Sequence, residues 1–184
     1  MGCGWLGLPL AKSLLAKGYS VYGTTTSATN IPNLEASGIK AFAVSISADT
    51  ITGNIHGFLK ELSILIVNIP PRLRGSLKEN YVEKMQLLLD AIAPSEIQKL
   101  IFISSTSVYG DLEGIVTEAT PPKPTTASGK QLWQAEKLFT AAPLETSIVR
   151  FGGLLGPARH PLTNLSLKKE LSNGNLPILS LIHI

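Results

Sequence analysis

Two kinds of hydrophobic spacing alternate along the chain. In two segments apolar residues repeat about every 3.6 positions, which predicts helices at residues 6–17 and 76–92, and a third helix is predicted at residues 129–141. Gly18 ends the first predicted helix and Pro94 ends the second. In the second segment the repeat is carried by Tyr81, Met85, Leu88, Leu89 and Ile92.

Short apolar runs rich in β-branched residues lie between these helices. They predict buried strands at residues 19–24, 41–46, 62–69, 100–104 and 147–151. Strands that alternate with helices pair into a parallel sheet through right-handed crossovers. The pattern therefore predicts an α/β fold, a doubly wound parallel sheet with helices on both faces.

Composition narrows the class of protein. The 184 residues are 44% hydrophobic and 16% charged, which fits one globular domain. The net charge of +3 comes from scattered lysines and arginines, so no nucleic-acid partner is expected. No apolar run has the length of about 18 residues that a membrane span needs, and no signal peptide follows Met1. A lone Cys3 and three isolated histidines predict no disulfide, no metal site and a cytoplasmic location.

The first candidate site is the glycine turn GCGWLG at residues 2–7, directly before the first predicted helix. In a G-x-G-x-x-G turn, Gly2 makes the tight bend, Gly4 lets the backbone approach a pyrophosphate, and Gly7 lets the helix pack closely. A strand follows at the expected distance, which favours dinucleotide binding over the alternative of a turn with no ligand. We interpret Cys3 as a small spacer rather than a reactive thiol.

The two ends of the chain affect the expected domain. A strand normally leads into such a turn, but only Met1 precedes Gly2, so the first strand is expected to be missing. We expect one NAD(P)-binding Rossmann-like domain over residues 1–178, incomplete at both ends, with the substrate-side region starting at about residue 152. Residues 179–184 match the translation of a sequencing-library adapter. We expect them to be a non-native tail, with a natural segment as the alternative.

The residues about twenty positions after the glycines bear on the cofactor. An acidic residue there binds the ribose hydroxyls of NAD, whereas this chain has Thr24, Thr25, Thr26 and Ser27. Hydroxyls without a carboxylate tolerate a 2′-phosphate, so NADP is slightly favoured over NAD. No arginine lies nearby to bind that phosphate, so the sequence does not decide between NAD and NADP. The alternative is that residues 24–27 form an exposed turn without a cofactor contact.

A second set of motifs points to a family. KLIFISSTSVYGD at residues 99–111 is followed by Glu118, Pro124 and TTASGKQLWQAE at residues 125–136. In this order the motifs resemble the extended and atypical short-chain dehydrogenase/reductase superfamily, the NAD-dependent epimerase/dehydratases. The run RFGGLLGP at residues 150–157 and the following Arg159-His160-Pro161 resemble its bacterial YeeZ-type branch.

The resemblance covers nearly the whole chain and implies a cofactor, a substrate and an assembly. It implies a Rossmann-type fold, NAD or NADP as cofactor and a small-molecule substrate. Two predicted helices, residues 76–92 and 129–141, resemble those that pair subunits in relatives. The resemblance therefore allows a homodimer without establishing one. The cofactor contacts expected on this basis are Gly2, Gly4, Trp5, Leu6, Gly7, Thr24, Thr25, Asn68, Ile69, Pro70 and Ser104.

The resemblance also implies catalytic positions, and this chain departs from them. The superfamily places a substrate-orienting serine four residues before the tyrosine of its V-Y-G turn, which is Ser105 here. The alternative is that Ser104 and Ser105 only satisfy local backbone groups. The usual Tyr-x-x-x-Lys acid-base pair falls on Ser128 and Leu132, which cannot perform its chemistry. We interpret Ser128 as a residue of the helix N-terminus and Leu132 as core.

Arg159 and His160, which follow the last predicted strand, are candidates to replace the missing acid-base pair. Arg159 could bind an anionic substrate group, and His160, with a pKa near neutrality, could donate a proton. An exposed loop histidine is the alternative. The sequence thus predicts an atypical NAD(P)-dependent oxidoreductase or epimerase. A non-catalytic dinucleotide-binding or redox-sensing protein is the alternative.

Overall fold

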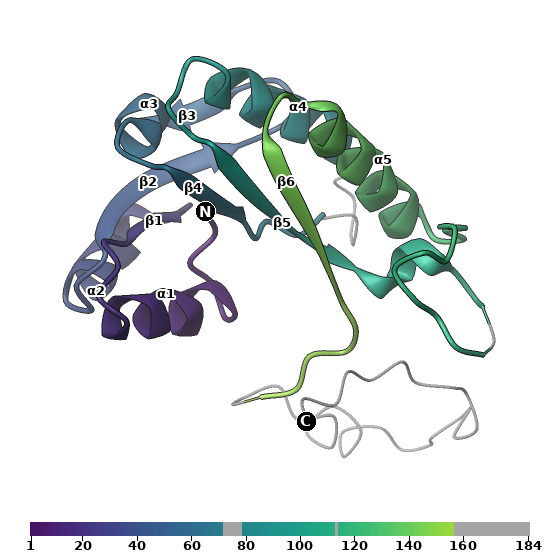
Figure 1. Ribbon diagram of the computed structural model, residues 1–184. Helices are drawn as coiled ribbons and strands as arrows, with labels where there is room; N and C mark the ends of the chain where they lie inside the picture. The colour runs from purple at the N-terminus through teal and green to yellow at the C-terminus, as the bar shows by residue number, and fades with distance from the viewer. Residues whose placement is uncertain (72–78, 113, 157–184) are drawn as a thin grey trace, which may run out of the picture.

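A computed structural model of the chain describes residues 1–71, 79–112 and 114–156. Helices and strands alternate along it, as the sequence predicts (Figure 1). The strands are β1 (Tyr22–Thr25), β2 (Lys40–Ile46), β3 (Ile51–Gly53), β4 (Ile64–Val67), β5 (Lys99–Ser105) and β6 (Glu145–Phe151). The helices are α1 (Gly7–Ala16), α2 (Ile31–Glu35), α3 (Ile55–Leu59), α4 (Tyr81–Ile92) and α5 (Ala127–Ala141), with short 3₁₀ turns η1 (Ala28–Asn30) and η2 (Thr106–Tyr109).

The strands form two three-stranded sheets, in the orders β1-β2-β3 and β4-β5-β6. All pairs are parallel except β2 and β3, which form an antiparallel hairpin. The first residues of the chain lie between β1 and β4 (Figure 1). The Met1 amino group donates to the Ile66 carbonyl at 2.6 Å, and the Cys3 amide donates to the Thr24 carbonyl at 3.0 Å. Among the described residues no strand is assigned before α1, so residues 1–3 connect the two sheets.

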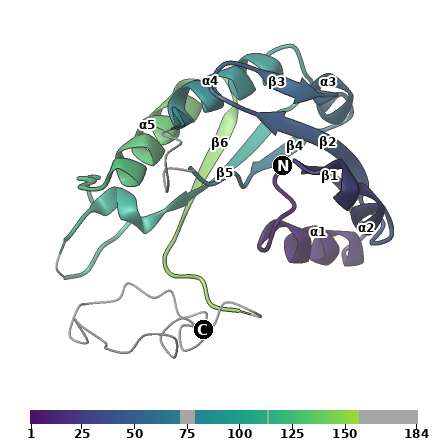
Figure 2. The ribbon, with the colours of Figure 1, turned by 180° about the vertical axis from the view of Figure 1, so that it is seen from behind.

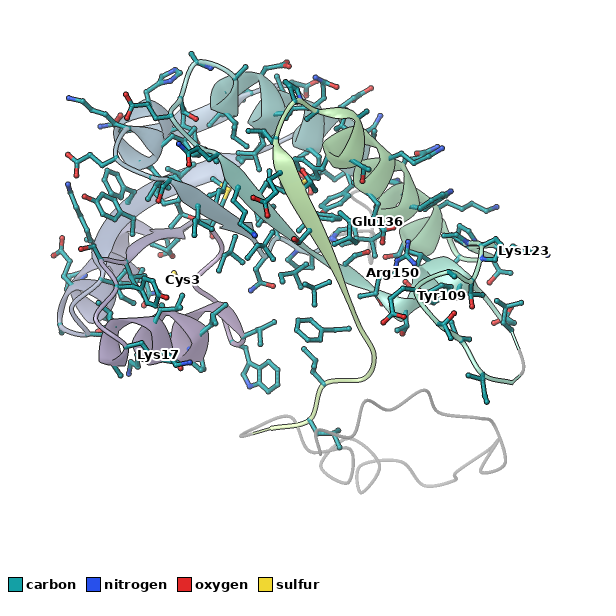
Figure 3. All side chains as sticks on the ribbon, in the orientation of Figure 1. Cys3, Lys17, Tyr109, Lys123, Glu136 and Arg150 are labelled. Carbon is teal, nitrogen blue, oxygen red and sulfur yellow. The ribbon has the colours of Figure 1, made fainter. Side chains whose placement is uncertain are left out.

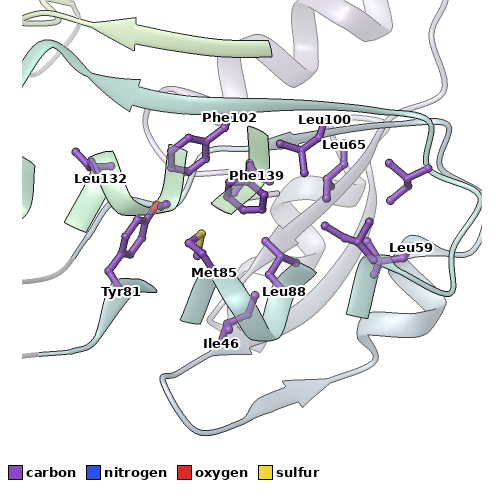
Figure 4. Packing of buried hydrophobic residues seen from close by; sticks show 14 of the residues in the cluster. Ile46, Leu59, Leu65, Tyr81, Met85, Leu88, Leu100, Phe102, Leu132 and Phe139 are labelled. Atoms are coloured by element: carbon purple, nitrogen blue, oxygen red, sulfur yellow. The ribbon is translucent and has the colours of Figure 1, made fainter. Parts of the chain in front are cut away.

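Helices cover both faces, which confirms the predicted α/β fold (Figures 1 and 2). On one face α1 and α2 enclose a small cluster of Ala11, Leu34 and Ile39. On the other face α3, α4 and α5 pack over a much larger core (Figure 4). The helical repeat of the sequence predicts that Tyr81, Met85, Leu88 and Ile92 belong to this second core, and all four are fully buried.

Element boundaries differ from the prediction where side chains or turns intervene. Strand β1 starts at Tyr22 instead of residue 19, because the Tyr19 amide still bonds to the Leu14 carbonyl at the end of α1. Helix α4 starts at Tyr81, because the Asn80 side chain accepts from the amides of Val82 and Glu83 and caps it there. The predicted start at Ser76 lies outside the described residues. Helices α2 and α3 and strand β3 were not predicted.

Candidate functional site

A cavity of about 1490 Å³ opens where the parallel strands end. The carboxyl ends of β1, β2, β4 and β5 contribute residues 24–26, 44–49, 68–70 and 103–105 to its wall. The glycine turn, the start of α4 and residues 151, 152 and 154 at the end of β6 also line the cavity. Ligands of open α/β sheets bind beyond the strand carboxyl ends, near the point where the strand order reverses. The sequence-predicted turn and the strand ends therefore meet at one site.

Each of the three positions in the turn is occupied by glycine for a different structural reason. Gly2 has a φ of +87°, and a Cβ added there would lie 2.3 Å from the Asn68 carbonyl oxygen. A Cβ on Gly7, the first residue of α1, would lie 2.1 Å from the Gly2 carbonyl oxygen. A Cβ on Gly4 would meet nothing within 4 Å, although Gly4 lines the cavity. Gly2 and Gly7 are thus required by the fold, whereas Gly4 leaves open space in front of the backbone.

Two predicted cofactor contacts hold this turn in place. The Thr24 hydroxyl accepts from the Gly2 amide at 3.0 Å, and Thr24 is only 3% exposed. The Asn68 side-chain amide donates to the Gly2 carbonyl at 3.3 Å. Both residues line the cavity, but these polar groups brace the glycine turn from two strands. The hydroxyl of Thr25, the next residue, donates to the Ser27 carbonyl at 3.4 Å.

Cys3, between the first two glycines, behaves as the spacer that the sequence suggested. Its sulfur would lie 2.6 Å from a Cβ on Gly23, so the thiol fills the space beside β1. Burial raises the pKa of the Cys3 thiol, which favours the protonated and unreactive form. The thiol is therefore part of the packing under the turn.

The wall at Ile69 and Pro70 is fixed by a buried tyrosine. The Tyr81 hydroxyl donates to the Ile69 carbonyl at 2.6 Å, and Tyr81 is fully buried. Burial also raises the pKa of Tyr81, so the phenol stays protonated and keeps donating. This bond ties the start of α4 to the segment after β4.

We expect Tyr81→Phe to lower the free energy of unfolding by about 1–2 kcal/mol, because the partly buried Ile69 carbonyl would lose its donor. Urea denaturation measures this effect. Tyr19→Phe is the matched control, since Tyr19 is 59% exposed and its change is expected to stay within about 0.5 kcal/mol. Equal midpoints for the two variants would contradict the structural role of the Tyr81 hydroxyl.

The serine pair at the end of β5 makes two different contacts. The Ser105 oxygen accepts from the Ser107 amide at 3.2 Å and caps η2, which is the local role considered as the alternative. This bond leaves the Ser105 hydroxyl hydrogen to donate, and Ser105 lines the cavity. Ser104 also lines the cavity, and its hydroxyl donates to the Glu136 carboxylate at 2.5 Å.

The positions of the usual acid-base pair lie away from the cavity. Ser128 is in the first turn of α5, and Leu132 is buried in the core. Lys130 is exposed, and no residue of α5 lines the cavity. Arg159 and His160, the suggested replacements, lie outside the described residues.

A buried charge network next to Ser104 was not predicted from the sequence. Glu136, on α5, is 2% exposed and accepts from Arg150 of β6, with the shortest bond at 2.6 Å from Nη2 to Oε2 (Figure 3). Arg150 Nη1 also donates to the Tyr109 hydroxyl at 2.7 Å, and that hydroxyl donates to the Thr117 carbonyl at 3.1 Å. The hydrogen bonds to Glu136 raise the pKa of Arg150. The one feature of the sequence that could have indicated this network is the position of Glu136 on the apolar face of the helix predicted at residues 129–141.

Two classes of site are not found among the residues that the structure describes. No three His, Cys, Asp or Glu side chains there are grouped so that they could hold a metal ion. In the same ranges, no helix has the length and apolar character needed to cross a membrane.

Comparisons with known proteins agree with this geometry. Residues 2–166 match the sequence profile of the NAD dependent epimerase/dehydratase family. The chain is 37% identical over 163 residues to the protein YeeZ of Escherichia coli K12. This match covers 88% of the chain and 60% of YeeZ, so the chain spans less than two thirds of that relative's length.

Solved structures share the same fold. One, from Methylobacillus flagellatus and named for the NAD-dependent epimerase/dehydratases, is 33% identical with a TM-score of 0.65, and the match covers 86% of the chain and 54% of that protein. Another is a UDP-glucuronic acid 4-epimerase variant from Bacillus cereus in complex with NAD and UDP-4-deoxy-4-fluoro-glucuronic acid. It is 25% identical with a TM-score of 0.70, and the match covers 86% of the chain and 57% of the epimerase.

Proposed function

This chain belongs to the NAD-dependent epimerase/dehydratase family, and from that premise we propose that it binds a nicotinamide dinucleotide in the cavity around the glycine turn. The observation that carries the proposal is the open backbone at Gly4. Among the residues that the structure describes, no side chain fills the space in front of Gly4, and none caps the N-terminus of α1 beside it. Unpaired amides at a helix N-terminus bind phosphate groups, so the pyrophosphate is proposed to lie there.

The remaining contacts follow from the position of each residue along the cavity. The glycine turn sits at the centre, with β1 and β2 on one side and β5 on the other. We assign the nicotinamide to the β5 side, where Ser105 would orient the substrate, and the adenosine to the β1 side. The proposed cofactor contacts are Gly2, Gly4, Trp5, Leu6, Gly7, Thr24, Thr25, Asn68, Ile69, Pro70 and Ser104.

Titration with NADH and NADPH tests the proposal. Trp5 lines the cavity, so its fluorescence reports binding there. We expect micromolar dissociation constants, with NADPH at least as tight as NADH, because residues 24–27 offer no carboxylate to repel a 2′-phosphate. No binding of either cofactor would reject the proposal. A tenfold preference for NADH would reject only the preference for NADP.

For the activity, we propose an oxidoreductase or epimerase that acts on a small molecule without the usual tyrosine and lysine. Ser105 is the proposed substrate-positioning residue, and Arg159 and His160 are proposed to bind and protonate substrate. UDP-sugars, which the Bacillus cereus relative binds together with NAD, are the first substrates to assay. Turnover that falls in Ser105→Ala and His160→Ala variants would support these roles.

A non-catalytic dinucleotide-binding or redox-sensing protein is the second candidate. It is favoured by Leu132, which puts an alkyl side chain in the core where a catalytic lysine would be needed. A positioned acid or base contributes about 10²–10⁴ in rate, so its loss could remove the activity altogether. Tighter binding of NADPH than of NADP, with no turnover over a broad substrate panel, would favour this candidate.

A further inference from the structure

The chain after β6 returns to the glycine turn. Strand β6 ends at Phe151, which pairs with Ser105 of β5 in the sheet. Five residues later, Gly156 lies against the indole ring of Trp5, because a Cβ added at Gly156 would be 2.8 Å from Cζ2 and 3.2 Å from Cη2 of that ring. The segment turns from the end of β6 towards the start of α1 (Figures 1 and 2). Residues 152–156 therefore connect the serine side of the cavity with the glycine turn.

This segment belongs to the cavity wall. Gly152 and Leu154 line the same cavity as Trp5. The segment begins beside Ser105 and ends against Trp5, the residue directly after Gly4. It thus spans the distance from the proposed substrate-orienting serine to the proposed position of the pyrophosphate. We call the contact between Trp5 and Gly156 the clasp.

The two ends of the segment are held differently. At its start, the ladder between β5 and β6 continues to Phe151, and the Phe151 carbonyl accepts from the Thr106 hydroxyl at 3.4 Å. At its other end, the clasp joins ring carbons to a glycine, and such dispersion contacts are individually weak. Gly152 and Gly153 lie between the two ends, and residues without a Cβ absorb backbone rotation readily. The clasp can therefore separate while β6 stays in place.

We propose that the clasp controls the exchange of the dinucleotide, an inference that rests on the proposed function. The cavity is closed while Trp5 contacts Gly156, and the cofactor enters and leaves when the two residues separate. A clasp that closes equally over the empty and the occupied cavity slows both steps by the same factor. It leaves the affinity unchanged, because the ligand does not favour either state. An ordinary binding contact would slow only dissociation.

Stopped-flow mixing with NADH tests the proposal. The fluorescence of NADH reports binding, and the observed rate plotted against NADH concentration gives both rate constants. The variant Trp5→Phe keeps an aromatic ring on the turn but lacks Cζ2 and Cη2, the atoms that reach Gly156. We expect association and dissociation to become about threefold to tenfold faster, as for breaking a few carbon contacts, and the dissociation constant to stay within about twofold.

A second variant changes the clasp from its other side. The methyl group of Gly156→Ala would lie 2.8 Å from the indole, so the far end of the ring has to move away. The same rise in both rate constants is expected. Trp133→Phe is the matched control, because Trp133 lies on α5, outside the described lining of this cavity. Both of its rate constants are expected to equal those of the wild-type protein.

The two rate constants separate the possible outcomes. Faster dissociation with unchanged association in Trp5→Phe would show that Trp5 is an ordinary binding contact. That result would overturn the clasp and leave the proposed function standing, as would unchanged rate constants in either clasp variant. A misfolded fraction would lower the amplitude of the signal and not change the rate constants. No binding of NADH by the wild-type protein would overturn both the clasp and the proposed function.

Discussion

Replacing Gly4 with valine is expected to weaken dinucleotide binding by at least about 100-fold while the protein stays folded. The valine side chain has room, because no atom of the described part of the chain lies within 4 Å of a Cβ at this position, and the backbone of Gly4 does not have a positive φ. The same open space is where the pyrophosphate would approach the turn. Losing two hydrogen bonds to a charged phosphate costs about 1.5–3 kcal/mol each, or at least about 3 kcal/mol together, which gives the expected loss of affinity.

A glycine three residues further on supplies the contrasting variant. Gly7→Ala would place a methyl group 2.1 Å from the Gly2 carbonyl oxygen, so it is expected to destabilise the fold itself. Thermal unfolding and NADPH titration of both variants separate the two effects. Tight binding by a folded Gly4→Val protein would show that the ligand does not lie against the turn.

The second large effect is expected from breaking the Glu136–Arg150 pair. Arg150→Met would leave the Glu136 carboxylate, at 2% exposed, without its cationic partner. Removing one partner of a buried pair costs about 3–5 kcal/mol, because the remaining charge stays out of water. Urea denaturation is expected to show a loss of unfolding free energy in this range.

A double variant shows whether Arg150→Met loses stability because an attraction is removed or because the Glu136 charge is left buried without a partner. Glu136→Leu/Arg150→Met removes both charges and is expected to recover most of the stability, since apolar replacements of buried pairs are often neutral. Lys99→Met is the surface control, because the Lys99–Glu145 pair is much more exposed and is expected to be worth at most about 1 kcal/mol. A double variant as unstable as Arg150→Met would indicate that packing and hydrogen bonds, not charge, explain the loss.

The local pattern of apolar residues was sufficient to predict the elements that have a strong hydrophobic repeat. The spacing of Tyr81, Met85, Leu88 and Ile92 identified both α4 and the residues that form the core. The glycine turn was predictable because its roles depend on neighbours in the chain. By contrast, β3 has three residues and forms only because Ser47 and Thr50 close a tight turn before it. No periodicity can be recognised in so short a segment.

Contacts between distant segments explain what the sequence could not predict. The sequence predicts Thr24 and Asn68 as ligand contacts at strand ends, and both line the cavity. That both brace Gly2 depends on the backbone path of two separate strands. The pairing of Glu136 with Arg150 likewise requires β6 to lie beside β5 under α5, which only the folded chain brings about.

The three residues between the two sheets also have a consequence for cooperativity. The α1–α2 layer has few buried side chains of its own, and the backbone of residues 1–3 and the Asn68 amide connect it to the β4–β5–β6 sheet. A ligand lying across this seam would touch both sides at once. Part of its binding free energy would then appear as mutual stabilisation of the two layers, so that they unfold together rather than one after the other.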